Sequence, residues 1–335
     1  MSSKSIEMAH GGGGGLAREL VEDQILARFG DGPLMGLPDS ASLPGGLLFT
    51  SDSFVVQPFE FPGGNIGDLA VHGTVNDLAV AGGKPRWLSL ALILEEGLPL
   101  DALARVLDSV KIAADNCGVS IATGDTKVVA RGQADGIYIN TAGIGTAIEG
   151  FELDPARVKE GDSVLVSGPL GDHGAAVLTA REGIDIAGNA VSDSAPVHRL
   201  VEAIAPLAES IRFMRDPTRG GLAAVLNELA DGIDLDIVLE ETDIPVSEAT
   251  HAVAEMLGLD ILQVASEGRV LAICAADAAD ELLQLWRALP EGCGAAIIGT
   301  ARKARGDLGR LVLTTLTGGE RLVDSPRGEL LPRIC

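Results

Sequence analysis

Aromatic and basic residues are scarce in this sequence of 335 residues. Aromatic residues make up 3% of the chain, although 46% of it is hydrophobic. The core must therefore be built from Ala, Val, Leu and Ile, which suits stacked α/β layers. Lys and Arg number 25 against 48 acidic residues, and the net charge is -23. This balance argues against nucleic acids and anionic membranes as partners, because binding them requires basic residues that replace counterions.

Paired cysteines and long apolar runs are also missing. None of the four cysteines forms a C-x-x-C pair, so neither a structural zinc site nor a thioredoxin-type motif is expected. The first residues lack an apolar signal region, and no apolar run approaches the roughly 20 residues needed to cross a bilayer. We therefore expect a cytoplasmic protein with reduced thiols.

The length and the changes of pattern along the chain predict two α/β domains followed by an arm. Residues 16–29 have helical periodicity, 47–56 are rich in β-formers, and a helix from 100 should end at Gly118. The pattern resets near 152–162. We place the domains at 1–150 and 151–324, and the arm at 325–335, where two prolines oppose a helix.

Acidic turns are the strongest chemical signal. Asp39, Asp52, Asp77 and Asp125 lie beside small residues, and "RDPTRGG" adds Asp216 and Arg219. Carboxylates in such turns suit Mg²⁺ bound with nucleotide phosphates. Each Asp taken alone is better explained as a helix cap or turn residue. The set as a whole, next to a glycine run, favours nucleotide binding.

Glycines 11–15 lead into the first predicted helix. Glycines allow close approach of phosphates, and helix N-termini favour anions. No Gly-Lys-Ser/Thr follows, so this is not a Walker A motif, and a flexible linker explains the glycines equally well. "VSGPLGDHG" also has strand–turn–helix form, with His173 in a structural role. The spacing of Lys127 and Glu267 alone assigns no function to either residue.

Several motifs taken together resemble one known family. "AHGGGGG", "FTSDSFVVQPFEFPGGNIGDLAVHGTVNDLAVAG", "TGDTKVV", "MRDPTRGGLA", "ASEGR" and "LPRIC" are similar to the hydrogenase expression/formation family HypE, of the PurM-like ATP-binding superfamily. The resemblance covers essentially the whole chain, and Pro-Arg-Ile-Cys is its most specific element. Two departures stand out. The family's Asp-Asp-Ala reads Asp39-Ser40-Ala41 here, and the glycine loop lacks a serine found in relatives.

The resemblance implies a two-domain PurM-like fold whose N-terminal sheet forms a homodimer, with ATP and Mg²⁺ in the cleft between the domains. The implied metal ligands are Asp39, Asp52, Asp77 and Asp125. The implied nucleotide-binding residues are Gly12, Gly13, Gly14, Asp52, Asn76, Asp77, Gly124, Asp125, Asp216, Arg219 and Gly220.

The resemblance also implies a reaction on the thiol of Cys335. The carbamoyltransferase HypF would load a carbamoyl group, ATP-dependent dehydration would convert it to an S-cyanide, and the cyanide would pass to iron on a HypC–HypD complex for a NiFe hydrogenase. Glu267 would be the base, and Lys127 a phosphate clamp or proton relay. The arm would swing between an outward and an inward position, with Gly328 as hinge and Pro326 and Pro332 keeping it extended.

Two other functions remain open. A sister kinase or synthetase acting on a free small molecule would not need Cys335 for turnover. A non-catalytic carrier would bind ATP without hydrolysing it.

Overall fold

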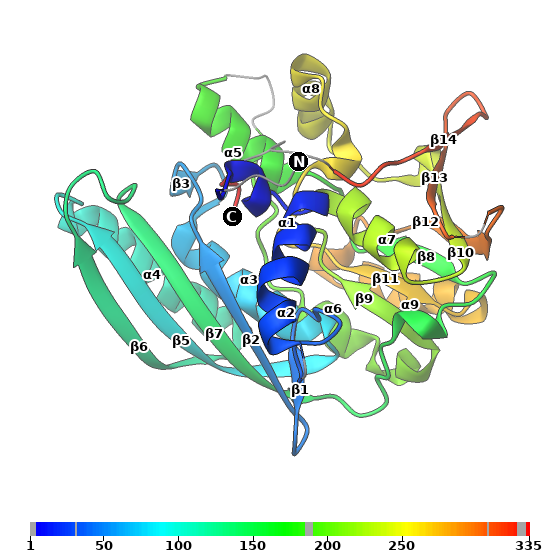
Figure 1. The fold of residues 1–335 in the computed structure, drawn as a ribbon, viewed down its shortest axis with the longest axis horizontal. Coiled ribbons are helices and arrows are strands. Elements are labelled where there is room, and N and C mark those ends of the chain that lie inside the picture. Colours follow the sequence, from blue (N-terminus) through cyan, green and yellow to red (C-terminus); the bar gives the residue numbers. More distant parts are fainter. Residues whose placement is uncertain (1–4, 31, 185–189, 307, 327–332) are drawn as a thin grey trace.

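The computed structural model describes residues 5–30, 32–184, 190–306, 308–326 and 333–335. Two β-sheets, one from each half of the chain, carry helices on their faces (Figure 1). The strands of the first sheet end at Ala147 and those of the second begin at Ser163. This arrangement confirms the predicted two-domain α/β class. In the part of the chain that is described, no helix is both long and apolar enough to cross a membrane.

The first sheet has five strands in the order β1-β2-β7-β5-β6. All neighbours pair antiparallel except β5 and β6, which are parallel. A separate two-stranded ribbon is formed by β3 (Glu60–Phe61) and β4 (Gly64–Asn65). The strands of the sheet are β1 (Ala41–Leu43), β2 (Leu47–Phe54), β5 (Gly83–Glu95), β6 (Ser120–Val129) and β7 (Ile137–Ala147).

Two helices cover one face of this sheet, α3 (Ile66–Val80) and α4 (Leu100–Cys117) (Figure 1). Asn65 begins α3, because its side chain accepts a hydrogen bond from the Gly67 N–H. The predicted end of α4 is confirmed: Gly118 adopts φ +66, a left-handed conformation that glycine tolerates best. Almost every residue of α3 is buried, so this helix is the centre of the first domain and contacts the second as well.

The other face of the first sheet is exposed and partly apolar. Phe49, Ile144 and Trp87 are register neighbours on β2, β7 and β5. Their side chains are 40%, 38% and 48% exposed. Large apolar side chains in one exposed row are unusual on a monomer surface and are typical of an interface.

The second sheet has seven strands in the order β14-β13-β10-β12-β8-β11-β9. Its two faces are packed by α7 and by α6 with α9, which contribute to separate apolar clusters. The strands are β8 (Ser163–Val166), β9 (Ile211–Arg215), β10 (Leu235–Glu240), β11 (Leu271–Cys274), β12 (Ala296–Lys303), β13 (Leu311–Thr314) and β14 (Glu320–Leu322). The helices are α5 (Asp172–Glu182), α6 (His198–Ala203), α7 (Gly221–Asp231), α8 (Glu248–Leu257) and α9 (Ala279–Arg287).

The predicted N-terminal helix is continuous but not uniform. A 3₁₀ turn (Met8–Gly11) precedes α1 (Gly15–Leu20), and a π-helical segment (Val21–Leu26) then joins α1 to α2 (Ala27–Phe29). Further 3₁₀ turns are Pro155–Arg157, Ala205–Ser210, Glu241–Asp243, Ile261–Gln263, Ala276–Ala278 and Pro290–Gly292.

The ends of the predicted arm are described, but its middle is not. Ser325 and Pro326 are described, as are Arg333 to Cys335. The proposed hinge Gly328 and Pro332 lie outside the described residues.

Candidate active site

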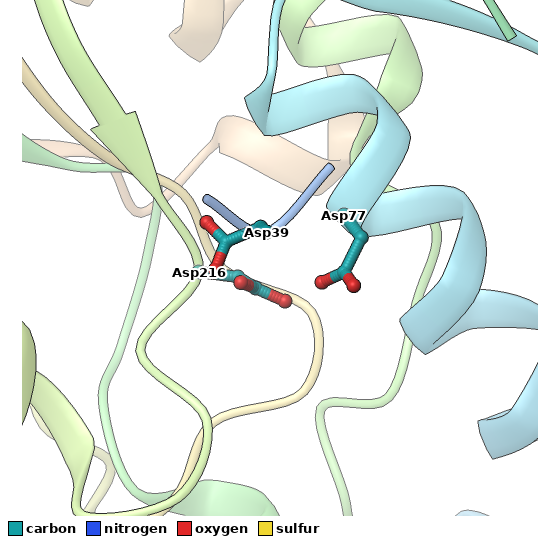
Figure 2. A group of neighbouring side chains, drawn as sticks. All are labelled: Asp39, Asp77 and Asp216. Carbon is teal, nitrogen blue, oxygen red and sulfur yellow. The ribbon is translucent and has the colours of Figure 1, made fainter. Parts of the chain in front are cut away.

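Three aspartates from distant parts of the chain meet between the two domains (Figure 2). Asp39 precedes β1, Asp77 lies on α3, and Asp216 directly follows β9. One carboxylate oxygen from each lies within 4.8 Å of the others. This is the donor set that a divalent cation prefers. Asp216 was expected to contact nucleotide, and the structure places it among the predicted metal ligands.

Burial and, after it, the charges of neighbouring carboxylates raise the pKa of these carboxyl groups. The pKa of Asp77 lies well above its usual range because of burial and then the charges of Asp52, Asp216 and Asp39. Burial, followed by Asp39 and Asp52, raises the pKa of Asp216 to about 8. Buried like charges disfavour their ionised forms unless a cation compensates them. The cluster is thus built to gain from a bound cation.

Two residues that sequence reasoning missed hold the cluster in place. The Thr50 hydroxyl lies 2.7 Å from Asp77 Oδ2 and 2.8 Å from the Asp39 carbonyl. Arg215 Nη2 lies 2.9 Å from Asp39 Oδ1. Strand alternation could have identified Thr50, because it shares the inward face of β2 with Asp52. Arg215 is adjacent to Asp216 in the sequence, which was the available signal.

Asp52 and Ser40 border the cluster and present unpaired oxygens. Among the described residues, Asp52 Oδ2 and Ser40 Oγ are buried without a hydrogen-bond partner. Buried polar atoms in native proteins are nearly always paired. These two atoms therefore suggest a polar ligand that completes the site. Ser40 occupies the position where the resembled family has a second Asp.

Glu267 and Cys335 both feel the charges of Asp52 and Arg219. Glu267 is 2% exposed, and its Oε1 has no hydrogen-bond partner among the described residues. Burial, and then the charges of Asp216 and Asp193, raise the pKa of Glu267 well above its usual range. Burial raises the pKa of the Cys335 thiol to about 12, opposed by the Arg219 guanidinium. The charge of the ionised Cys335 sulfur is in turn the largest influence that raises the pKa of Arg219.

Asn76, a predicted nucleotide-binding residue, bonds across the domain boundary. Its Nδ2 donates to the carbonyls of Ala195 (3.1 Å) and Glu267 (3.0 Å), and its Oδ1 accepts from the Val197 N–H at 2.8 Å. The residue is fully buried. Both amide protons bond carbonyls of the second domain, so Asn76 joins the domains and fixes the Glu267 backbone, while its contact with nucleotide stays a prediction.

The glycine run lies against Arg219 and the start of the arm. Gly13 has φ +66, and a Cβ there would come within 2.8 Å of Arg219. Gly14 has φ +116, and a Cβ there would meet the Pro326 carbonyl. Gly12 caps the preceding 3₁₀ turn, and Gly220 caps α7. A side chain at either Gly13 or Gly14 would push the loop away from Arg219 or from Pro326.

A cavity of about 380 Å³ opens beside this loop. It is of the size found for small-molecule sites. Besides the two glycines its lining includes Arg18, Arg215, Arg219 and Glu228. The guanidinium groups of these arginines are suited to binding phosphate oxygens. The cavity and the aspartate cluster share Arg215, which pairs with Asp39.

Gly124, Asp125 and Lys127 are not brought to this site within one chain. They lie on β6, the edge strand, where Lys127 pairs with Asp125. The register runs Asp125–Ala91–Asn140–Ser53, so Asp125 shares a face with Ser53 and not with Asp52. Three strand spacings, about 14 Å, separate β6 from β2. Strand pairing places Asp125 on the exposed face of the sheet, so within one chain it lies apart from the other predicted metal ligands.

Comparisons with known proteins show which family and fold the chain shares. The N-terminal domain of AIR synthase related proteins matches residues 39–147, and their C-terminal domain matches 159–309. The carbamoyl dehydratase HypE of Azotobacter vinelandii is 46% identical, over 99% of this chain and 97% of that protein. HypE in a crystallised HypE–HypF complex is 40% identical, with a TM-score of 0.88 over 92% of this chain and 99% of that one. HypE crystallised with ATP is 43% identical, with a TM-score of 0.82 over 99% and 100%.

Proposed function

The chain belongs to the HypE family of carbamoyl dehydratases and has its PurM-like fold, and on that premise we propose that it dehydrates a carbamoyl group carried on its own Cys335. As a member of this family it is an ATP-using enzyme of hydrogenase maturation. The observations that carry the proposal are the docked terminal residue, whose main-chain oxygen accepts from the Val55 N–H at 3.1 Å, and the buried, unpaired Oε1 of Glu267 among the described residues. The charges of Arg219 and Glu267 both act on the pKa of the Cys335 thiol.

The reaction converts a carboxamide into a nitrile with loss of one oxygen. A carboxamide oxygen is a poor leaving group, so the γ-phosphoryl group of ATP is transferred to it and ADP departs. The C–O bond then breaks and inorganic phosphate leaves with that oxygen. The nitrogen loses its two protons, and the tail carries S–C≡N. Positioning and electrostatic stabilisation are the main contributions a protein makes to phosphoryl transfer.

Glu267 is the base in this proposal. Its Oε1 is buried and unpaired among the described residues, so it is available to accept a proton from the carboxamide nitrogen. A raised pKa makes the ionised carboxylate a stronger base. Asp193 accepts a hydrogen bond from the Glu267 N–H at 3.0 Å. Together with Asn76 this bond fixes the backbone that carries the base.

Mg²⁺ fits the aspartate cluster. Asp39, Asp77 and Asp216 supply converging oxygens, and Asp52 adds an unpaired one. When bound, the ion would neutralise charge on the phosphates and on these carboxylates. Arg215 and Arg219 would hold phosphate oxygens in the adjoining cavity.

A homodimer explains how Asp125 and Lys127 take part. The row of Phe49, Ile144 and Trp87 offers an apolar surface on the same face as Asp125. A second copy packed on this face would bring its own Asp125 and Lys127 toward the first copy's site. Lys127 could then act on the transferring phosphoryl group.

The partners follow from the same family assignment. A solved relative forms a complex with HypF, and we infer that HypF loads Cys335 here. A HypC–HypD complex then accepts the cyanide on iron. We place these steps in the cytoplasm, where a free thiol stays reduced.

Intact mass of the protein after incubation with HypF, carbamoyl phosphate and ATP tests the proposal. Wild-type protein should end with a cyanated tail. Glu267→Gln should accumulate the carbamoylated tail, because only dehydration needs the base. Glu255→Gln, an exposed change on α8, is the matched control and should behave as wild type. A cyanated tail in Glu267→Gln would refute the role of Glu267.

A sister activity on a free small molecule is tested by Cys335→Ser. ATP-dependent turnover of a free small molecule by this variant would support that alternative.

A further inference from the structure

The last three residues of the chain are held on one side by an extended segment of the first domain. The Val55 N–H donates to the Cys335 main-chain oxygen at 3.1 Å, and the Gln57 N–H donates to the Arg333 carbonyl at 3.2 Å. Alternate residues pair, as they do between β-strands. The Ile334 side chain is 2% exposed and belongs to the apolar core of the first domain. The segment is therefore docked against the first domain.

The Ile334 carbonyl points the opposite way, toward α5 of the second domain. His173 Nε2 lies 2.7 Å from it, in a fully buried position. A carbonyl can only accept, so Nε2 must carry the ring proton. The other ring nitrogen, Nδ1, then accepts from the Ser192 hydroxyl at 2.8 Å.

The surroundings of His173 maintain this single tautomer. The Ser192 oxygen accepts from the Ser194 N–H at 3.1 Å, which directs the hydroxyl proton toward the imidazole. The ring of Phe61 packs edge-on at 5.2 Å. Burial lowers the pKa of His173 to about 4, so the ring is neutral at physiological pH. A neutral imidazole can therefore donate to the Ile334 carbonyl, while Arg181 bonds the Arg333 carbonyl.

We propose that His173 is the positioning residue that holds residues 333–335 in the docked position and so keeps the Cys335 thiol in the proposed active site. It acts through the Ile334 carbonyl and touches no reacting atom. The effect of His173 on dehydration rests on the proposed function, whereas its effect on docking rests on the contacts of residues 333–335. His173 is the one partner of that carbonyl among the described residues.

Removing the donor should release the tail without unfolding the protein. An unpaired buried carbonyl would disfavour docking by roughly tenfold, the typical effect of one hydrogen bond. Loading by HypF requires an accessible thiol, so it should stay equal or become faster. Dehydration requires the docked thiol, so it should slow. Opposite changes in these two steps are not expected from general loss of structure.

The test measures the reactivity of Cys335 toward an aromatic disulfide reagent in a Cys293→Ser background. Cys293 is the other cysteine that is not buried, whereas Cys117 and Cys274 are buried. His173→Leu should raise the reaction rate about tenfold. His173→Gln, which retains a donor near the Nε2 position, should remain close to the parent.

Ser192→Ala keeps the ring and removes its hydroxyl partner, and it should give a smaller increase. A folded His173→Leu variant with the parent rate would overturn the proposal. If His173→Leu does not fold, Ser192→Ala decides, and a parent rate in that variant would overturn it. The thiol assay uses neither ATP nor HypF. A released thiol with no dehydration in any variant would therefore refute the proposed function and leave the positioning role standing.

Discussion

Replacing Asn76 by alanine should loosen the contact between the two domains. Asn76 lies on α3 of the first domain, and its three hydrogen bonds all go to the second. Each bond contributes about 1 kcal/mol net, and deleting the side chain leaves buried main-chain groups unpaired. The small cavity adds about 1 kcal/mol, and the better helix propensity of Ala returns about 0.5 kcal/mol. The expected loss is therefore about 3–4 kcal/mol in the free energy of unfolding.

Urea unfolding followed by tryptophan fluorescence measures this loss, since Trp286 is fully buried in the second domain. Asn227→Ala is the matched control. Asn227 also lies on a helix, but among the described residues its amide bonds only the Ala223 carbonyl of the same helix, at 2.8 Å. The control should lose less than about 1 kcal/mol. Equal losses in the two variants would refute the idea that Asn76 fastens the domains.

Two further predictions concern the metal site and the dimer. Asp77→Asn and Asp125→Asn should each abolish Mg²⁺-dependent ATP binding in calorimetry, because both carboxylates belong to the site proposed for the dimer. If either variant keeps the wild-type affinity, that residue is not part of the site. Trp87→Asp should dissociate the dimer in analytical ultracentrifugation and weaken ATP binding with it, since Asp125 acts from the second copy. Leu100→Asp, at an 81% exposed position of α4, is the control, and a Trp87→Asp protein that stays dimeric would contradict the proposed interface.

Local features of the chain could be predicted because their causes are local. The end of α4 depends on Gly118, whose left-handed φ is a property of that single residue. The α/β class follows from an aliphatic composition and from alternating patterns. The motifs of the glycine run, the acidic turns and the terminal Pro-Arg-Ile-Cys were sufficient to indicate the family.

The membership of the metal cluster could not be read from these motifs. Asp125 and Asp52 sit in similar turn-like sequences, yet pairing places them on opposite faces of one sheet. A strand reverses its side chains at every residue, so the face depends on register, which is decided by partners far away in sequence.

Contacts between residues far apart in the sequence determine how the site is assembled. The sequence by itself determined which chemical groups are available: carboxylates, glycines, basic side chains and a thiol beside Ile334. Only the tertiary structure decided that Asp216 lies close to Asp39 and Asp77. It also decided that the Asn76 side chain bonds the second domain and that His173 lies against the Ile334 carbonyl. Each of these contacts joins residues more than a hundred positions apart, and packing of the two domains, rather than any local preference, brings them together.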